Sequence, residues 1–182
     1  MGDENGSMGG FQLWANLPAS HKMMSPRYRD VQSSQIPEVI TGDGIKIRII
    51  CGEVQGTVGP VQDIITNPEY LDVGIPAGKI WTHPKSSGYT ALAYCFEGSG
   101  WFDHQKTALV DGESLVHFSD GNTITVTAGE NALRFLLISG KPIREPVAWY
   151  GPIVMNTRQE LEIAFDEYSK GTFIKHPDLE RK

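Results

Sequence analysis

Short runs of alternating apolar and polar residues, each ended by a turn signal, are the feature that most constrains this fold. Residues 45–49 place their isoleucines on one face, and residues 71–75 and 123–127 repeat the same period of two. Residues 92–96 and 133–138 are apolar almost throughout and end at glycine-containing turns. Because such runs recur about every 8–15 residues without an intervening amphipathic helix, the sequence predicts an all-β sandwich or barrel.

One helix is predicted near the end of the chain, over about residues 157–170. Thr157 and Glu160 have the spacing of a capping box, and Gly171 is placed to end the helix. A single apolar stripe follows the capping box at helical spacing, formed by Leu161, Ala164, Phe165 and Tyr168.

The first residues raise a separate question. Residues 11–17 alternate as a half-buried strand and stop at Pro18, and they carry Trp14. Such a strand needs a partner sheet, and the nearest other strand signals lie well downstream. The sequence therefore predicts three regions, which are residues 1–36 as a strand with a connector, residues 37–150 as a compact β domain, and residues 151–182 as a tail.

Charge and cysteine usage narrow the class of protein. The net charge is −6 and no run of Lys and Arg exceeds two residues, which argues against direct nucleic-acid binding. No apolar run reaches the roughly 18 residues of a membrane span, and no signal peptide is recognisable. Cys51 and Cys95 lie in apolar runs and are interpreted as buried reduced thiols. We therefore expect a cytoplasmic protein without a membrane partner.

Several long stretches resemble the pirin family in order along the chain. They are "GGFQLWANLPASHKMMSPRYRDV", "IKIRIICGEVQGTVGPVQ", "YLDVGIPAG", "AYCFEGSG" and "RFLLISGKPIREPVAWYGPIVMNT", and the resemblance covers roughly residues 9–170. Pirins are bicupins, with two jelly-roll barrels, a linker and a C-terminal tail helix. Their known members include nuclear transcriptional co-regulators and bacterial quercetin 2,3-dioxygenases. The resemblance implies a cupin-type double-stranded β-helix, a jelly-roll barrel, with one C-terminal helix.

The resemblance covers only the second half of the family pattern. In the family, three histidines and one glutamate of the first barrel hold Fe(II), and the last two of these ligands lie in a short His-Ser-Glu-Met-like segment. Met1 falls where the methionine of that segment would be. No ligand can be carried over, so the resemblance implies no cofactor in this chain. Residues 11–17 then resemble the closing strand of the missing N-terminal barrel. We expect the partner to be a separate N-terminal cupin half, or a second copy that associates through residues 11–17 and the tail.

Three residues of the remaining barrel are weighed as metal or catalytic candidates, which are His83, His117 and Glu97. His83 lies where a first cupin motif would stand, but Lys85 occupies the place of a second histidine. The structural alternative makes His83 a loop residue at the barrel mouth and His117 a hydrogen-bonded strand residue. Two histidines alone offer few ligands for iron or zinc. No residue is therefore assigned as catalytic, and His21, His104 and His176 are interpreted as structural or solvated.

Three functional hypotheses follow. The first is a non-catalytic structural or interaction module. The second is a free-standing cupin enzyme, dioxygenase-like or isomerase-like, that uses His83, His117 and Glu97. The third is a split pirin, in which a separate N-terminal half supplies iron and quercetin 2,3-dioxygenase activity arises in trans.

Overall fold

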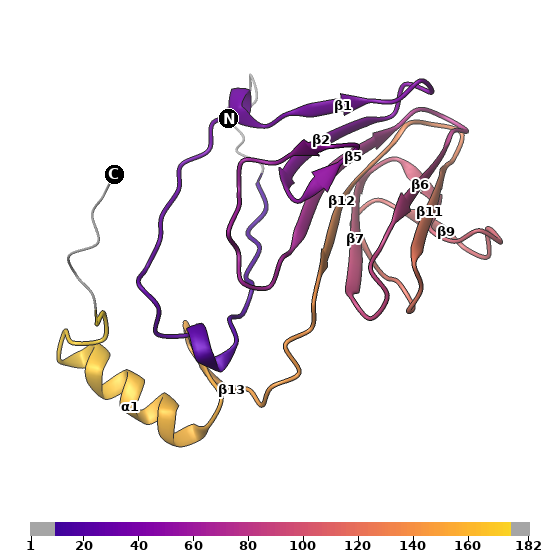
Figure 1. Cartoon of the computed structure of the whole chain (residues 1–182). Coiled ribbons are helices and arrows are strands. Elements are labelled where there is room, and N and C mark those ends of the chain that lie inside the picture. The colour runs from indigo at the N-terminus through magenta and orange to yellow at the C-terminus, as the bar shows by residue number, and fades with distance from the viewer. Residues whose placement is uncertain (1–9, 176–182) are drawn as a thin grey trace, which may run out of the picture. The chain divides into compact units, whose positions relative to one another are not determined.

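The computed structural model describes residues 10–175 and divides them into two compact units (Figure 1). The larger unit comprises residues 27–144, and the smaller one joins residues 10–26 to residues 145–175. The segment 27–36, which the sequence predicts as a connector, thus belongs to the larger unit. The predicted boundaries lie near residues 36 and 150.

Two antiparallel sheets form the larger unit. The six-stranded sheet runs in the order β1 (Glu38–Ile40), β2 (Lys46–Cys51), β5 (Glu69–Ile75), β12 (Leu133–Gly140), β7 (Thr90–Glu97) and β10 (Ser114–His117). The four-stranded sheet runs in the order β6 (Ile80–Pro84), β11 (Thr123–Ala128), β8 (Ser99–Trp101) and β9 (Leu109–Asp111). A short hairpin of β3 (Glu53–Val54) and β4 (Thr57–Val58) and the 3-10 turn η2 (Ser33–Gln35) complete the unit.

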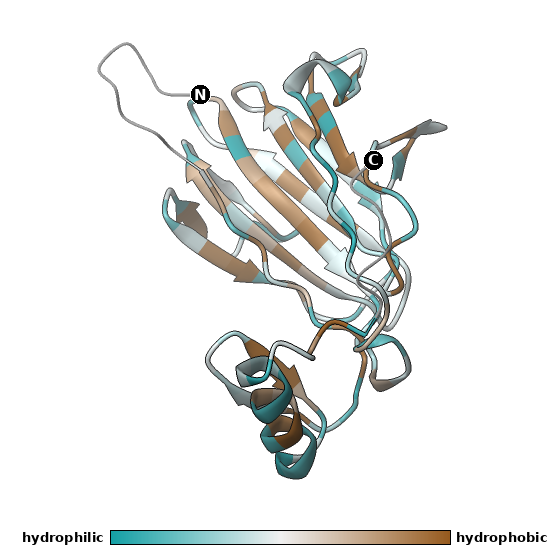
Figure 2. Cartoon of the chain, turned by 90° about the vertical axis from the view of Figure 1, so that its left-hand side faces the viewer, coloured by the Kyte–Doolittle hydropathy of each residue, from teal (hydrophilic) through white to brown (hydrophobic). Residues whose placement is uncertain are grey.

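The predicted all-β jelly-roll architecture is confirmed. Every run predicted from period two or from continuous apolarity is a strand, and each one extends to within two residues of its predicted ends. The alternation is visible along the strands in Figure 2. Successive side chains of a strand point to opposite faces, so the apolar set of each strand faces the space between the sheets.

Phe135 lies at the centre of the core between the two sheets. Its ring centroid lies 5.8 Å from that of Trp81 on β6 and 5.2 Å from that of Phe102. The largest fully buried side chains around it come from both sheets and include Ile47, Ile49, Leu71, Ile75, Ile124, Leu133 and Leu137. Burial of this apolar set is the main stabilising contribution to the barrel.

The two glycines of the "GSG" turn lie where the backbone of another segment comes very close. Gly98 has a φ of 72°, and a Cβ atom there would overlap the carbonyl oxygen of Ala132. A Cβ atom on Gly100 would lie 2.5 Å from the carbonyl oxygen of Thr127. Both positions therefore exclude side chains, which explains the two glycines.

The smaller unit contains η1 (Ala19–His21), a hairpin of β13 (Ala148–Tyr150) and β14 (Ile153–Met155), and the helix α1 (Arg158–Ser169). The predicted capping box is confirmed, because the Glu160 backbone N–H donates to Thr157 Oγ1 at 3.2 Å and Glu160 Oε2 accepts from the Thr157 N–H at 2.8 Å. Gly171, with a φ of 71°, follows the helix and ends it. A second core joins Ile153, Met155 and Ala164, and partly buried Leu161 and Phe165 pack against it, whereas Tyr168 is exposed.

Residues 11–17, which resemble a strand whose native sheet is missing, form no strand in the described chain. Residues 10–18 have no regular secondary structure, and no strand of the described chain pairs with them. Alternation alone does not make a strand, because its N–H and C=O groups need a neighbouring strand to bond with. Phe11, Leu13 and Trp14 are exposed, while Trp14 and the three residues after it line a small cavity with β14 and Phe173 inside the smaller unit.

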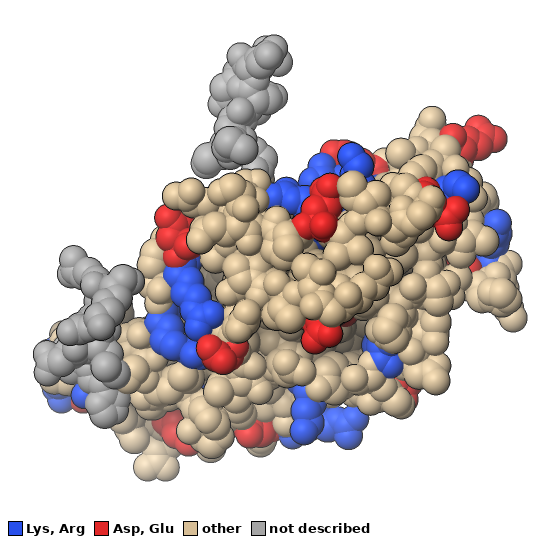
Figure 3. Space-filling view, turned by 45° about the horizontal axis from the view of Figure 1, so that its top comes forward, with Lys and Arg blue, Asp and Glu red and all other residues tan. Residues whose placement is uncertain are grey.

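Both cysteines are free and buried, as predicted. Among residues 10–175, no helix combines the length and the apolar character needed to cross a membrane. On the face of the molecule in Figure 3, Lys and Arg lie beside Asp and Glu in small groups of mixed sign.

Candidate functional site

One end of the barrel interior is polar. Cys51, Glu69, His83 and Ser139 occupy inward positions at the ends of β2, β5, β6 and β12. Each continues the alternation of its strand, for Glu69 is in phase with Leu71, Val73 and Ile75. Because these strand ends meet at the same end of the two sheets, the apolar core is replaced there by a polar layer.

The centre of this layer is a pair of titratable side chains from opposite sheets. His83 Nε2 lies 2.8 Å from Glu69 Oε1, and the two side chains are 6% and 20% exposed. The imidazole also stacks on Trp81, with ring centroids 4.9 Å apart and planes inclined by 16°. His83 is therefore fixed on two sides, by a ring and by a carboxylate.

Ser139 completes the arrangement from the six-stranded sheet. It is the cross-strand partner of Glu69, and its hydroxyl donates to Glu69 Oε2 at 3.3 Å. Among residues 10–175, each oxygen of the Glu69 carboxylate thus has one hydrogen-bond partner. The carboxylate is held in place and half of its acceptor capacity stays free.

Lys85 lies just beyond β6 and is almost fully buried. Its Nζ donates to the carbonyl oxygens of Tyr89 at 2.9 Å and of Ser86 at 3.3 Å, and lies 3.5 Å from Asp120 Oδ1. The backbone N–H of Gly88, above all, and that of Gly121 lower the pKa of Asp120, and Lys85 lowers it further. Two carbonyl oxygens and one carboxylate therefore surround the ammonium, which fixes the loop after β6.

Cys51 closes the other side of the polar layer. Its thiol donates to the carbonyl oxygen of Pro68 at 3.2 Å. Burial raises the pKa of the Cys51 thiol, and the nearby Glu69 carboxylate acts in the same direction. The thiol is thus kept protonated, so it is a poor nucleophile and a poor metal ligand.

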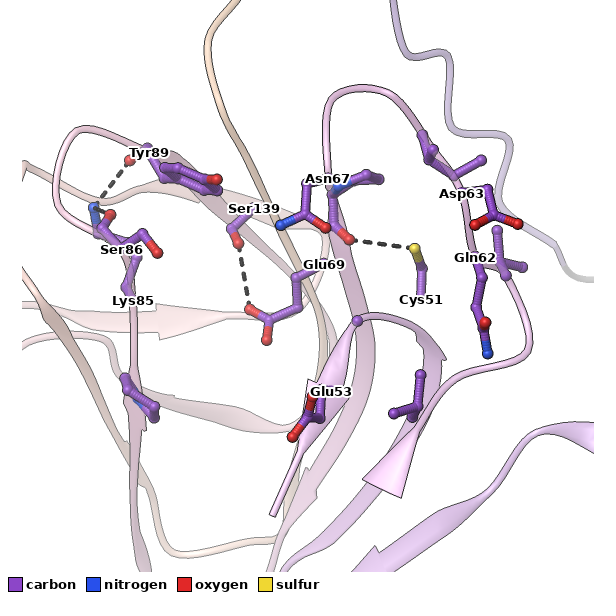
Figure 4. A pocket seen from close by; sticks show the side chains of 16 residues that line it. Cys51, Glu53, Gln62, Asp63, Asn67, Glu69, Lys85, Ser86, Tyr89 and Ser139 are labelled. Atoms are coloured by element: carbon purple, nitrogen blue, oxygen red, sulfur yellow. Dashed lines mark hydrogen bonds between the residues drawn. The ribbon is translucent and has the colours of Figure 1, made fainter. Parts of the chain in front are cut away.

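A pocket of about 530 Å³ opens above this layer (Figure 4). Figure 4 shows the Glu69 carboxylate at its centre, with Ser139 and Asn67 above and Glu53 below. One wall comes from the segment 58–68 and the opposite wall from the segment 84–89, and both contribute polar and apolar groups. The pocket therefore has the size of a small-molecule site with a polar floor.

The three candidates predicted from the sequence do not come together. His83 is not a loop residue at the barrel mouth, since it lies in β6, where pairing with Ile124 on β11 turns its side chain inward. His117 ends β10, the edge strand of the other sheet, and is exposed. Glu97 ends β7 and bonds to Arg134 at 3.4 Å on the surface. His104 lies in an exposed turn, His21 lies in η1, and His176 lies outside the described residues.

Comparisons with known proteins now decide the family. The family model of the pirin C-terminal cupin domain matches residues 70–174. This chain belongs to the pirin family. It is 39% identical over 171 residues to a pirin-like protein of Caulobacter vibrioides, covering 93% of this chain, and 36% identical over 162 residues to Pirin-1 of Arabidopsis thaliana, covering 87% of this chain.

A solved structure agrees with the pirin assignment. The crystal structure of a quercetin 2,3-dioxygenase from Acinetobacter baumannii matches 88% of this chain with a TM-score of 0.79 and 28% sequence identity. The match takes up 55% of that structure, and this chain spans 60% of the Caulobacter relative and 56% of the Arabidopsis one. The predicted resemblance to the C-terminal part of pirins is thereby confirmed.

The residues of this pirin chain do not fit the iron site that the family resemblance implies. Within residues 10–175, no three or more side chains of His, Cys, Asp or Glu gather where they could hold a metal ion. The pair of His83 and Glu69 supplies one imidazole and one carboxylate, compared with three and one in the expected ligand set. We derive no step through iron, and the absence of a cofactor from this chain stays a prediction.

Sequence reasoning missed Glu69, Ser139 and the buried role of Lys85. A signal for each was present, because Glu69 is in phase with Leu71, Ser139 with Leu137, and Lys85 with His83. If each strand is extended by two residues beyond its apolar run, the alternation places these side chains in the barrel interior. Nothing in the sequence indicated that Glu69 and His83, which lie 14 positions apart in strands of different sheets, come together.

Proposed function

We propose that this chain is the C-terminal cupin module of a pirin-type protein and serves as a structural or interaction module without iron chemistry of its own. The observation that supports this proposal is the pairing of His83 with Glu69. The one histidine among the described residues that faces the barrel interior is already hydrogen-bonded to its nearest carboxylate and stacked on Trp81. A carboxylate partner is also common behind metal-ligating histidines. The pairing therefore weighs against iron only together with the finding that, within residues 10–175, no three side chains of His, Cys, Asp or Glu gather where they could hold a metal ion.

The partner that we propose is an N-terminal cupin half, joined to the module or supplied as a separate chain, which would hold Fe(II). Two observations support it. The chain spans about 60% of the Caulobacter relative, so the relative has a further part that this chain does not match. The smaller unit exposes large aromatic side chains, with Trp149 at 68% and Tyr150 at 71%, as expected of an interaction surface.

A second candidate is a quercetin 2,3-dioxygenase-like activity of the chain itself. The likeness to the Acinetobacter structure favours it, as does the placement of an imidazole and a carboxylate beneath a pocket of suitable size. In this alternative His83 would act as a ligand or as a general base.

Metal content and turnover distinguish the two candidates. The purified chain is incubated with Fe(II) under nitrogen, desalted and analysed for iron, and quercetin consumption is then followed by absorbance in air. We expect substoichiometric iron and no turnover by the chain alone, and retention of a tagged N-terminal cupin half of a longer relative. Near-stoichiometric iron together with turnover that His83→Ala abolishes would overturn the module proposal. Failure to retain the N-terminal half would overturn the proposed partner.

A further inference from the structure

The pocket at the polar end of the barrel has two walls that are each fixed by basic side chains. On one side, Arg27 Nη2 donates to the carbonyl oxygen of Asp63 at 2.8 Å, and Arg29 Nη1 donates to that of Gln62 at 2.9 Å. On the other side, Lys85 holds the carbonyl oxygens of Ser86 and Tyr89. A pocket with fixed walls loses little conformational entropy when a ligand enters.

The floor of the pocket presents a carboxylate with unused acceptor positions. An ionised carboxylate accepts about four hydrogen bonds, and Glu69 receives one at each oxygen, from His83 and from Ser139. His83 and Ser139 are themselves buried, and their hydrogen bonds orient the carboxylate. The Glu69 carboxylate lines the pocket, where Figure 4 draws it among the other lining side chains, so a ligand in the pocket can reach it.

The charged groups that a ligand in this pocket could contact are negative. The Nζ of Lys85 donates to two backbone carbonyl oxygens and lies 3.5 Å from the Asp120 carboxylate, so its charge is already engaged by groups of the protein. Glu53, from the β3–β4 hairpin, adds a second carboxylate on the same side of the pocket (Figure 4). Apolar groups are supplied by the segment 58–68, namely Val58, Val61, Ile64 and Pro68.

These features together select a ligand with a positively charged hydrogen-bond donor and a small apolar body. We propose that the pocket binds a small organic ammonium ion, with its N–H groups on Glu69 and its apolar part against Val61 and Ile64. This proposal does not rest on the role of the chain as a partner module. The two can fail separately, because iron and quercetin measure one and amine binding measures the other.

Isothermal titration calorimetry with three matched probes tests the proposal on the full chain at pH 7.5. The probes are 2-phenylethylamine, which is an ammonium ion at this pH, neutral 2-phenylethanol and anionic 3-phenylpropionate. We expect saturable binding of the amine below a concentration of order 10 mM, with at least tenfold weaker binding of the alcohol and of the carboxylate. Equal affinity for amine and alcohol, or no saturation by the amine, would overturn the proposal.

Single substitutions test whether the amine binds at Glu69. Glu69→Gln preserves the shape of the side chain and removes its charge, and we expect at least a tenfold loss of amine affinity. If this variant melts early, a second pair decides the matter, because Ser86 lines the pocket and its exposed neighbour Ser87 does not. Ser86→Arg places a cation at the rim and should weaken amine binding at least tenfold, whereas Ser87→Arg should change it less than twofold. Equal effects of the two arginines, or full affinity in a folded Glu69→Gln protein, would contradict a site at Glu69.

Discussion

The contact between His83 and Glu69 should be a measurable link between the two sheets of the barrel. The perturbation is a double-mutant cycle with Glu69→Ala, His83→Ala and the double variant. His83 belongs to the four-stranded sheet and Glu69 to the six-stranded one, and their side chains are 6% and 20% exposed. Solvent therefore screens this pair much less than a surface pair.

The size of each effect follows from what each substitution leaves behind. Glu69→Ala leaves a buried imidazole nitrogen without its partner, which costs about 1–3 kcal/mol in the free energy of unfolding. His83→Ala also removes the ring that stacks on Trp81 and leaves a cavity, so we expect about 2–4 kcal/mol. The coupling free energy between the two should be about 1–2 kcal/mol, as measured for side chains in direct contact.

Urea unfolding followed by far-UV circular dichroism gives the four free energies. The control cycle is Lys79 and Asp43, whose Nζ and Oδ1 lie 3.1 Å apart with side chains 50% and 64% exposed. We expect a coupling free energy of about 0.2–0.5 kcal/mol for that surface pair. A coupling between Glu69 and His83 no larger than the control would refute the interpretation that burial makes this contact strong.

Four further predictions concern the helix, the glycine turn and the first residues. Thr157→Ala removes the N-cap and should lower the stability of the smaller unit by about 1 kcal/mol, measured by thermal melting. Hydrogen bonding from Thr157 lowers the pKa of Glu160, so this stabilisation is present above the unfolded-state pKa and is lost as pH falls through the lowered folded-state value. Glu160→Gln should flatten the acid dependence of helical circular dichroism, and an unchanged dependence would exclude the capping box as its source. Gly98→Ala, where φ is positive and the Cβ meets backbone, should destabilise the barrel by at least about 2 kcal/mol, whereas Gly121→Ala has open space and should be nearly neutral. Deleting residues 1–18 should leave the melting temperature of the barrel unit nearly unchanged, because the described part of that segment pairs with no strand of it, and a large loss would contradict this.

The sequence was sufficient for features that arise from near neighbours along the chain. Period two in residues 45–49 and 123–127 predicted β2 and β11, because alternation is a property of the extended backbone itself. Thr157 and Glu160 predicted the start of α1, since a capping box closes within one turn. The family resemblance, too, was correct at the level of linear motifs.

Only the tertiary structure decided which side chains meet. It brought Glu69, His83 and Ser139 into one polar layer, although Ser139 lies 70 residues from Glu69 along the chain. It also left residues 11–17, which alternate as well as any confirmed strand, without a sheet. The physical reason is the same in both cases. Periodicity fixes the direction of a side chain relative to its own strand, but pairing and contact depend on which strand ends lie together in space.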